Sequence, residues 1–193
     1  MRRSALVLII AANIAGAGPA KKAEPLPPLN EKVAAFARSN LGKPVGDGIC
    51  ITLAIEALRD AGARGFPLSD PKGDYVWGAP VAEFKDALPG DILQFRDAVF
   101  HGKRSVGRTR YVTWHHEYPH HTAIVARVEQ GGKLIAVYHQ NVDFQGKESD
   151  RDKVQEGELR MDSLQPGGWV KIYRPVPPAP PDRPSDDDAG PGR

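Results

Sequence analysis

The sequence predicts an α+β fold in which N-terminal helices pack on an antiparallel β-sheet. Two segments in the first third of the chain, residues 30–38 and 50–61, carry apolar residues at helical spacing. Later segments have the composition of strands, and two of them, residues 122–128 and 133–139, flank a glycine-containing turn. Helices followed by such a sheet are typical of α+β domains. The chain of 193 residues is long enough to bury one hydrophobic core.

Residues 1–17 have the three parts of a secretory signal peptide. Arg2 and Arg3 precede an apolar run, and Ala15 to Ala17 supply the small residues after which signal peptidases cut. The run is short for a membrane span and Lys21 follows it closely, although an uncleaved anchor is the alternative. We therefore predict an exported protein, secreted or periplasmic, with no membrane partner after signal cleavage.

Composition shifts divide the rest of the chain into three parts. Residues 18–29 are a Pro-rich linker, residues 30–174 the folded domain, and residues 175–193 a Pro- and Asp-rich tail. The tail has too little apolar surface to fold, so we expect it to be disordered.

The balance of charges excludes an obvious polyanion partner. Lys plus Arg number 26 and Asp plus Glu number 24, whereas nucleic-acid binding needs a large basic excess on one face. We therefore expect no nucleic acid, and we expect a monomer. One segment, residues 103–110, gathers four basic residues, which we interpret as a solvated loop.

Capping residues support the two predicted helices. Asn30 is suited to cap the first helix, which we expect to end at Arg38. Asp47 is a candidate N-cap for the helix over residues 50–61, and Gly62 is its expected stop.

Four segments are predicted strands. Residues 91–95 follow a Pro-Gly turn, and residues 122–128 and 133–139 form a hairpin around Gln130-Gly131-Gly132. Residues 169–173 are the expected last strand.

Cys50 is the single cysteine of the chain, so no internal disulfide can form. It stands in the first turn of the second predicted helix, where free N–H groups and the helix dipole favour an anion. We therefore expect a thiol that ionises more readily than a free one. The alternative is a small apolar side chain buried in the core.

Four of the six histidines lie within residues 115–121. Residues 116–120 match the H-E-x-x-H pattern of zinc peptidases, but that pattern works on a helix, and Pro119 disfavours one. Looser metal binding by the cluster stays open, but we predict no metal site and no cofactor. The other interpretation is that His121, at the start of a strand, is a general base.

A third polar group should orient the imidazole of His121 by hydrogen bonding its other nitrogen. The next predicted strand ends in three candidates: His139, Gln140 and Asn141. A tight two-residue turn would place Gln140 on the face of His121, whereas a three-residue or bulged connection would place His139 and Asn141 there. The sequence alone leaves this register open.

The order of these motifs resembles the NlpC/P60 and CHAP branches of the papain-like cysteine hydrolases. A closer resemblance is to the cysteine-proteinase-fold domain of fungal myosin tail region-interacting proteins and related sequences. It rests on five motifs, in chain order Gly46 to Ala54 (GDGICITLA), Tyr75 to Gly78 (YVWG), Pro89 to Phe95 (PGDILQF), His121 to Val125 (HTAIV) and Tyr138 to Asn141 (YHQN). The similarity spans about residues 46–174.

The resemblance implies a papain-like fold and hydrolysis of a peptide or amide bond by a Cys50–His121 pair. It favours His139 as the third member, as in NlpC/P60 enzymes, although papain uses asparagine and Asn141 therefore stays open. The D-C-S-G signature is absent around Cys50, so a bacterial cell-wall substrate does not follow. The backbone N–H of Cys50 is the natural first oxyanion donor, with Gln94 as a candidate second. The alternative is a non-catalytic module of the same fold that binds a peptide or a cell-surface polymer.

Overall fold

The computed structural model describes residues 25–64, 67–69, 74–143 and 148–178. The predicted signal peptide, most of the predicted linker and the tail beyond residue 178 lie outside these ranges. Within the described ranges, no helix combines the length and the apolar character that crossing a bilayer requires.

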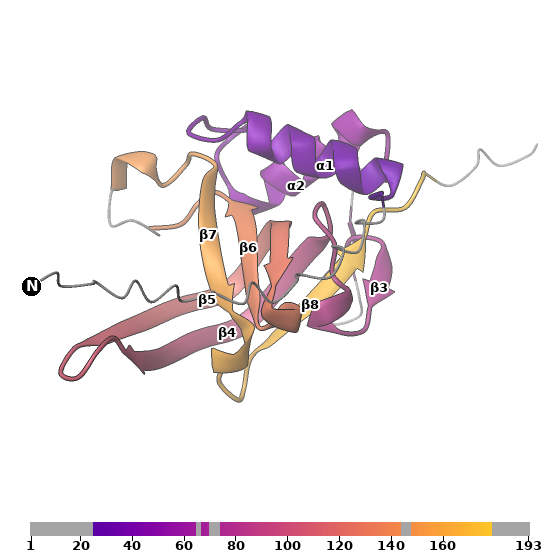
Figure 1. Cartoon of the computed structure of the whole chain (residues 1–193). Coiled ribbons are helices and arrows are strands. Elements are labelled where there is room, and N and C mark those ends of the chain that lie inside the picture. The colour runs from indigo at the N-terminus through magenta and orange to yellow at the C-terminus, as the bar shows by residue number, and fades with distance from the viewer. Residues whose placement is uncertain (1–24, 65–66, 70–73, 144–147, 179–193) are drawn as a thin grey trace, which may run out of the picture.

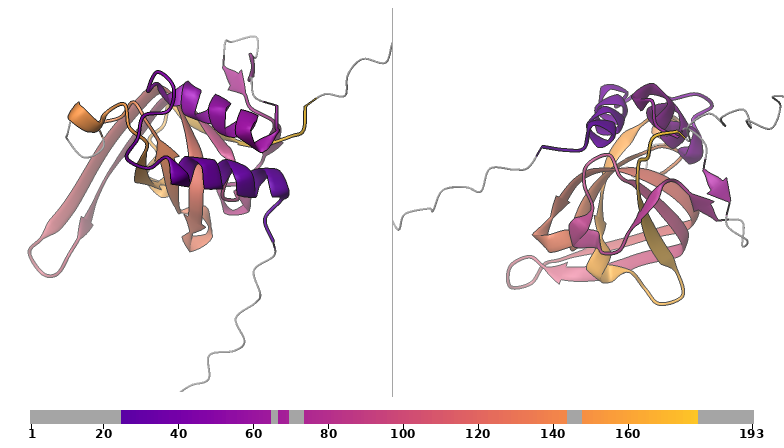
Figure 2. Two further views of the ribbon diagram at one scale, coloured as in Figure 1. Left: turned by 90° about the horizontal axis from the view of Figure 1, so that it is seen from above. Right: turned by 90° about the vertical axis from the view of Figure 1, so that its right-hand side faces the viewer.

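Two helices, α1 (Pro28–Ser39) and α2 (Cys50–Ala61), lie side by side on one face of the main sheet (Figure 1, Figure 2). The bounds of α2 confirm the prediction, and Gly62 ends it in the left-handed conformation with φ 73°. The start of α1 differs, because Pro28 at the first helical positions has its φ angle preset for a helix. Asn30 therefore does not cap α1 but lies buried in its first turn.

The main sheet has six strands in the order β3-β8-β4-β5-β6-β7, and every pair is antiparallel. The strands are β3 (Ala79–Val81), β4 (Ile92–Ser105), β5 (Tyr111–Glu129), β6 (Leu134–His139), β7 (Gln155–Arg160) and β8 (Trp169–Arg174). A separate ribbon pairs β1 (Leu68–Ser69) with β2 (Tyr75–Val76). Single helical turns of the 3-10 type are η1 (Phe84–Asp86), η2 (Gln130–Gly132), η3 (Glu148–Asp150) and η4 (Met161–Ser163). The predicted α+β class is confirmed, and all four predicted strands lie within strands of this sheet or begin one residue outside them.

The two faces of the sheet build two parts of the core. Ile92 of β4 and Ile124 of β5 pack with the apolar residues of α1 and α2. Their neighbours Leu93, Ala123 and Val125 point to the other face, where the sheet curls around a second apolar cluster (Figure 2). The helices thus cover the outside of the curl, and the second cluster fills its inside.

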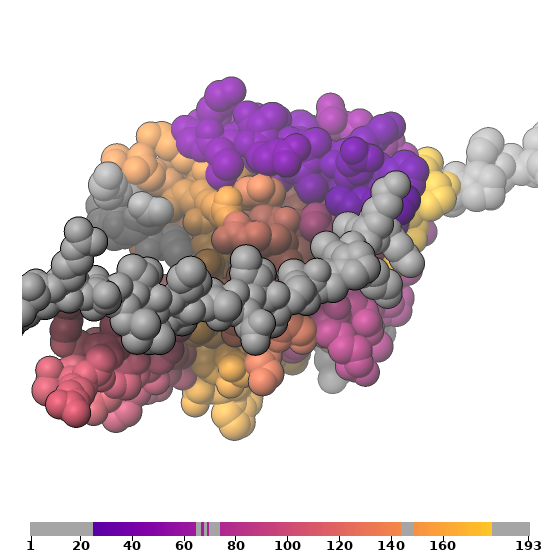
Figure 3. Space-filling view, viewed as in Figure 1, coloured from indigo at the N-terminus to yellow at the C-terminus, as the bar shows by residue number. Residues whose placement is uncertain are grey.

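Beyond the sheet, β4 and β5 continue as a two-stranded arm that stands off the body (Figure 1, Figure 3). The arm is a regular ladder from the pair Ala98–Tyr118 to the pair Ser105–Tyr111. The solvated loop predicted for residues 103–110 is therefore wrong in part, because residues 103–105 are strand and only residues 106–110 form the tip. The histidine-rich segment is strand as well, since each of its residues from His115 to His121, apart from Pro119, has a register partner on β4.

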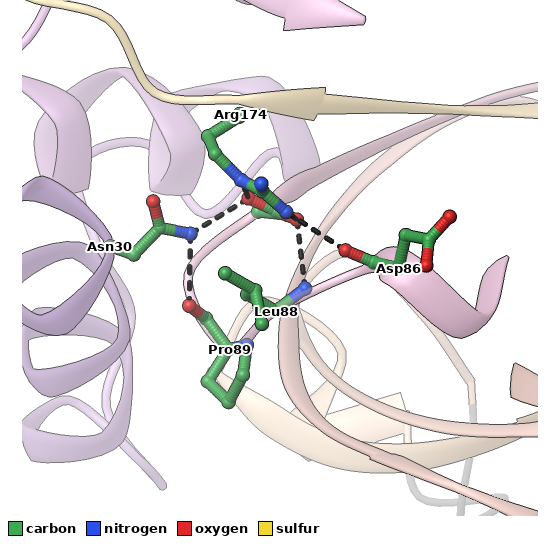
Figure 4. A network of polar contacts seen from close by, with 6 residues as sticks. Asn30, Asp86, Leu88, Pro89 and Arg174 are labelled. Carbon is green, nitrogen blue, oxygen red and sulfur yellow. Dashed lines mark hydrogen bonds and ion pairs between the residues drawn. The ribbon is translucent and has the colours of Figure 1, made fainter. Parts of the chain in front are cut away.

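A buried polar network joins α1, the turn before β4 and the end of β8 (Figure 4). The carboxylate of Asp91, which is fully buried, accepts hydrogen bonds from Asn30 Nδ2 at 2.7 Å, from the Leu88 backbone N–H at 2.8 Å and from Arg174 Nη2 at 3.0 Å. Asn30 Nδ2 also donates to the Pro89 carbonyl at 3.0 Å. The buried carboxylate is thus satisfied by three elements that are distant in sequence, and it holds the helices to the sheet.

Candidate active site

Cys50 begins α2 after a glycine-containing loop that other side chains shape. Asp47 Oδ1 accepts hydrogen bonds from the backbone N–H of Ile49 at 3.2 Å and from Thr52 Oγ1 at 2.7 Å. The prediction that Asp47 is the N-cap is wrong, because Ile49 occupies that position and Asp47 supports the helix start from two residues before it. Gly46 has φ 59°, and a Cβ atom there would lie 2.4 Å from Thr52 Cγ2, so the turn requires glycine.

Gln140 ties this loop to the end of β6. Its Oε1 accepts from the backbone N–H of Val45 at 3.1 Å, and its Nε2 donates to the carbonyls of Val45 at 3.0 Å and Ile49 at 2.8 Å. The side chain is fully buried. Gln140, one of three candidates for orienting His121, instead holds the backbone that leads into Cys50.

The thiol of Cys50 is partly buried, and its pKa is raised. Loss of hydration is the largest cause, and contact with the backbone of Thr122 opposes the shift without cancelling it. The expectation of a readily ionised thiol is therefore wrong, because desolvation outweighs the favourable position at the helix start. Cys50 is a neutral thiol at neutral pH.

His121 and His139 meet on the inner face of the curled sheet. His121 Nε2 lies 3.3 Å from His139 Nδ1, and the rings form an edge-to-face pair with centroids 5.4 Å apart. Four residues, 130–133, connect β5 to β6, and this even number alone would place Gln140 on the face of His121, as a two-residue turn would. A bulge between Val125 and Arg127 shifts the pairing by one residue, and it is why His139, and not Gln140, shares the face of His121.

Both rings are buried among aromatic side chains. His121 is 5% exposed and His139 is 1% exposed. Tyr118 stacks on His121 with ring centroids 5.0 Å apart, and Phe95 lies 5.6 Å away. Burial lowers the pKa of His121 well below its ordinary value and that of His139 to about 3, so both imidazoles are neutral at neutral pH. Tyr118 is a residue that sequence reasoning missed, and only its place in the histidine-rich segment hinted at it.

Asn141 follows β6 in the left-handed region with φ 62°, exposed to solvent. Its side-chain oxygen accepts a hydrogen bond from Arg151 Nε at 3.2 Å. The structure thus brings His139 to His121 and gives the side chain of Asn141 a different partner.

Cys50 and His121 approach the sheet from different sides. The sulfur contacts the backbone of Thr122, the residue next to His121, but the His121 ring points to the face opposite the helices. Within the described part of the chain, no hydrogen bond joins the thiol to the imidazole. The Cys50 sulfur thus lies against the backbone of β5, but it is not hydrogen bonded to the imidazole of His121.

The side chain of Gln94 is hydrogen bonded in the protein interior. Its Oε1 accepts from Trp77 Nε1 at 3.0 Å and from Thr122 Oγ1 at 2.9 Å, and the side chain is fully buried. The candidate role of second oxyanion donor is wrong, because the donor atom of this fully buried side chain, Nε2, donates to the Phe95 carbonyl at 3.3 Å.

A cavity of about 400 Å³ lies beside His121. It is lined by seven consecutive residues of β5, 115–121, together with Asn141, Asp143 and Arg151. Neighbouring strand residues point to opposite faces, so a cavity that touches all seven runs along the edge of the strand. β6 pairs with β5 only from Ile124 onward, which leaves this edge to the cavity.

The histidine-rich segment does not form a metal centre of the H-E-x-x-H kind. His116 and His120 lie on β5, where residues four apart are too distant to share one ion as they do on a helix. Among the described residues, no group of three or more His, Cys, Asp or Glu side chains is placed to hold a metal ion.

A cysteine at a helix start, a histidine on the adjoining strand and a second histidine on the next strand define a protein of the papain-like cysteine proteinase fold. The comparisons with known proteins agree. Residues 29–179 match the family described as the AIM3/BBC1 cysteine proteinase-fold domain, and the chain belongs to this family. No curated protein and no solved structure matches the chain.

Proposed function

We propose that the protein is a thiol hydrolase that cleaves a peptide or amide bond through an acyl-thioester on Cys50. The observation that carries the proposal is the contact of His121 Nε2 with His139 Nδ1, on a strand whose next residue, Thr122, contacts the Cys50 sulfur through its backbone. A second polar group that holds the base is the partner that a Cys-His hydrolase requires.

The tautomers follow from the proton that His121 must accept. With Nε2 directed at His139, the nitrogen left for the thiol is Nδ1, which must be unprotonated. Neutral His121 then carries its proton on Nε2 and donates it to His139 Nδ1. The low pKa of His121 keeps the ring in this proton-accepting form.

In the first half-reaction the sulfur of Cys50 attacks the carbonyl carbon while its proton moves to His121 Nδ1. The backbone N–H of Cys50, which starts α2 and has no intrahelical acceptor, faces the developing oxyanion. The C–N bond then breaks, His121 returns the proton to the leaving amine, and the acyl group stays on sulfur. Water attacks the thioester with its proton going to His121, and breaking of the C–S bond restores the thiol.

The His121 ring faces away from Cys50, so the reaction requires it to leave its place against Phe95 and Tyr118 and turn toward the sulfur when substrate binds. Catalytic hydrogen bonds in free enzymes are often formed only with substrate. Because both groups rest neutral, transfer of the thiol proton accompanies substrate binding and does not precede it. An extended peptide suits the cavity, because among the described residues no strand pairs with the 115–121 stretch of β5 on the side away from β4, and its backbone groups there could accept an added strand.

A panel of acyl-amino-acid p-nitrophenyl esters, followed by intact mass spectrometry, tests the proposal. We expect acylation of the wild-type chain at Cys50 and none in Cys50→Ser. His121→Ala should slow acylation by about 100-fold or more, the usual contribution of a general base. His101→Ala, an exposed histidine on β4, is the matched control and should react like wild type.

The second candidate is a binding module that keeps the fold without turnover. The missing hydrogen bond between Cys50 and His121 favours it, together with their unfavourable pKa values. A folded wild-type chain that gives no acyl adduct and no release of p-nitrophenol would support this module against the hydrolase. If wild type and Cys50→Ser then bind peptide equally, the cavity along β5 would be the peptide-binding site of this module.

We also propose that the protein is exported, on the basis of residues 1–17. N-terminal sequencing of the protein recovered from outside the cytoplasm should start after Ala17. Recovery of the intact chain from the cytoplasm would contradict export.

A further inference from the structure

The tip of the β4–β5 arm combines positive charge with exposed apolar side chains. The four cations of the segment, all exposed, are Lys103, Arg104, Arg108 and Arg110. From Ala98 to His116 the sequence contains no Asp or Glu, and the first acidic residue of the arm is Glu117, near its base.

Three large apolar side chains stand beside these cations. Val106 is 43% exposed, Tyr111 66% and Val112 51%, and they are three of five such residues in the described part of the chain. Lys103 Nζ lies 5.9 Å from the centre of the Tyr111 ring, so cation and aromatic group share one face of the arm. Arg104 is paired across the ladder with Val112, so the other face of the arm also carries a cation beside an apolar side chain.

The arm holds this group away from the body in a defined shape. The eight cross-strand positions from Ala98 to Ser105 span about 24 Å at the usual rise per residue. The tip is closed by a hydrogen bond of 2.7 Å from the Val106 backbone N–H to the Arg110 carbonyl, and Ser105 Oγ donates to the Gly107 carbonyl at 2.8 Å. The cations are therefore carried at the end of an ordered finger that projects beyond the rest of the molecule (Figure 3).

We propose that the tip of the arm is a docking site for an anionic membrane surface. Val106, Tyr111 and Val112 would enter the interface between headgroups and acyl chains, and the four cations would face the anionic headgroups. A convex finger suits a flat and deformable surface. The cavities that could hold a peptide lie mainly along strand residues nearer the body, and Val112 of the tip lines the end of one of them. We predicted no membrane partner because the N-terminal apolar run is short for a membrane span, but docking by a folded tip does not require a spanning segment.

The acidic tail of the same chain is a less suitable partner for the tip of the arm than an anionic membrane surface. Residues 175–178, the last described residues, leave the body on the side away from the arm (Figure 1, Figure 2).

Co-sedimentation of the full chain with vesicles tests the proposal. We expect binding to phosphatidylcholine vesicles that contain 30% phosphatidylserine and much weaker binding to pure phosphatidylcholine, both in about 0.1 M salt, where the Debye length is about 10 Å. Arg108→Ser with Arg110→Ser should weaken binding about 25-fold, since each basic residue near an anionic surface contributes about fivefold. The N-terminal apolar run is present in every variant, so differences between variants report the arm.

The matched control removes two exposed lysines from the body, Lys32→Ser with Lys43→Ser, and should bind like wild type. Tyr111→Ser should reduce binding, whereas Leu41→Ser, which removes an exposed apolar residue near α1, should not. All variants should keep the circular dichroism spectrum and the Cys50 alkylation rate of wild type, which separates this test from that of the hydrolase.

Equal binding of the arm variants and wild type, or no preference for anionic vesicles, would overturn the proposal. Tighter binding to poly-glutamate or to a single-stranded oligonucleotide than to the anionic vesicles would also overturn it, and would assign the tip to that polyanion.

Discussion

The buried histidine pair makes the stability of the fold depend on pH in a range where few other groups titrate. His121 and His139 are neutral in the folded protein, and their folded pKa values lie below the ordinary value of 6.5. In the unfolded chain both rings take up protons as the pH falls below about 6.5. The contribution of these rings to stability is therefore complete above pH 6.5 and is lost on acidification toward the folded pKa, about 3 for His139.

The magnitude follows from the unfolded pKa alone as long as the folded ring stays neutral. At pH 5, each ring costs about 2 kcal/mol of unfolding free energy relative to pH 7.5, or about 4 kcal/mol for both. The half-buried His116, whose pKa is also lowered, adds a smaller loss of the same sign. A loss of this size is a large part of the roughly 5–15 kcal/mol that stabilises a typical domain.

Urea denaturation at pH 7.5, 6.5, 5.5 and 5.0, followed by far-ultraviolet circular dichroism, measures the effect. For each neutral buried ring, the unfolding free energy should fall little between pH 7.5 and 6.5 and approach a slope of about 1.4 kcal/mol per pH unit toward pH 5.0. His139→Gln removes one of the two buried rings, so it should remove the contribution of one ring to this slope, whatever its effect on stability at pH 7.5. His101→Gln changes an exposed histidine and should leave the slope as in wild type.

A wild-type loss below about 1 kcal/mol between pH 7.5 and pH 5 would refute the reasoning, because the rings would then be protonated in the folded state. An unchanged slope in His139→Gln would show that other groups cause the pH dependence.

Three further predictions concern the thiol and the buried polar groups. Iodoacetamide should alkylate Cys50 several-fold more slowly than free cysteine at pH 7.5, and the rate should still rise with pH above 9.0. Fast alkylation at pH 6 would contradict this prediction and would indicate a thiolate–imidazolium pair. Asp91→Ala should lower the urea-derived unfolding free energy by about 3 kcal/mol, since it leaves Arg174 and buried donors without their acceptor, whereas the exposed Asp60→Ala should cost almost nothing. Gln140→Ala should cost about 2 kcal/mol and speed the alkylation of Cys50, because the loop before it loses three hydrogen bonds; a rate equal to wild type would contradict this role.

The sequence by itself determined the local elements. Apolar spacing and Gly62 defined α2 to the residue, because a helix and its stop depend on contacts within a few residues. The Gln130–Gly132 turn located the hairpin of β5 and β6 for the same reason. The choice between His139 and Gln140 could be reduced to two registers, since side-chain direction in a strand follows from counting.

Only the tertiary structure decided what depends on contacts between distant segments. The side to which the His121 ring points, and with it the distance from Cys50, is set by packing on Phe95 and Tyr118, which no local pattern specifies. The pKa of the thiol is decided by burial against β5, which overrides the helix start that a sequence can show. The exposed cations of residues 103–110 lie together at the tip of one arm because β4 and β5 stay paired beyond the other strands of the sheet. The length of this pairing cannot be predicted from the composition of the segment.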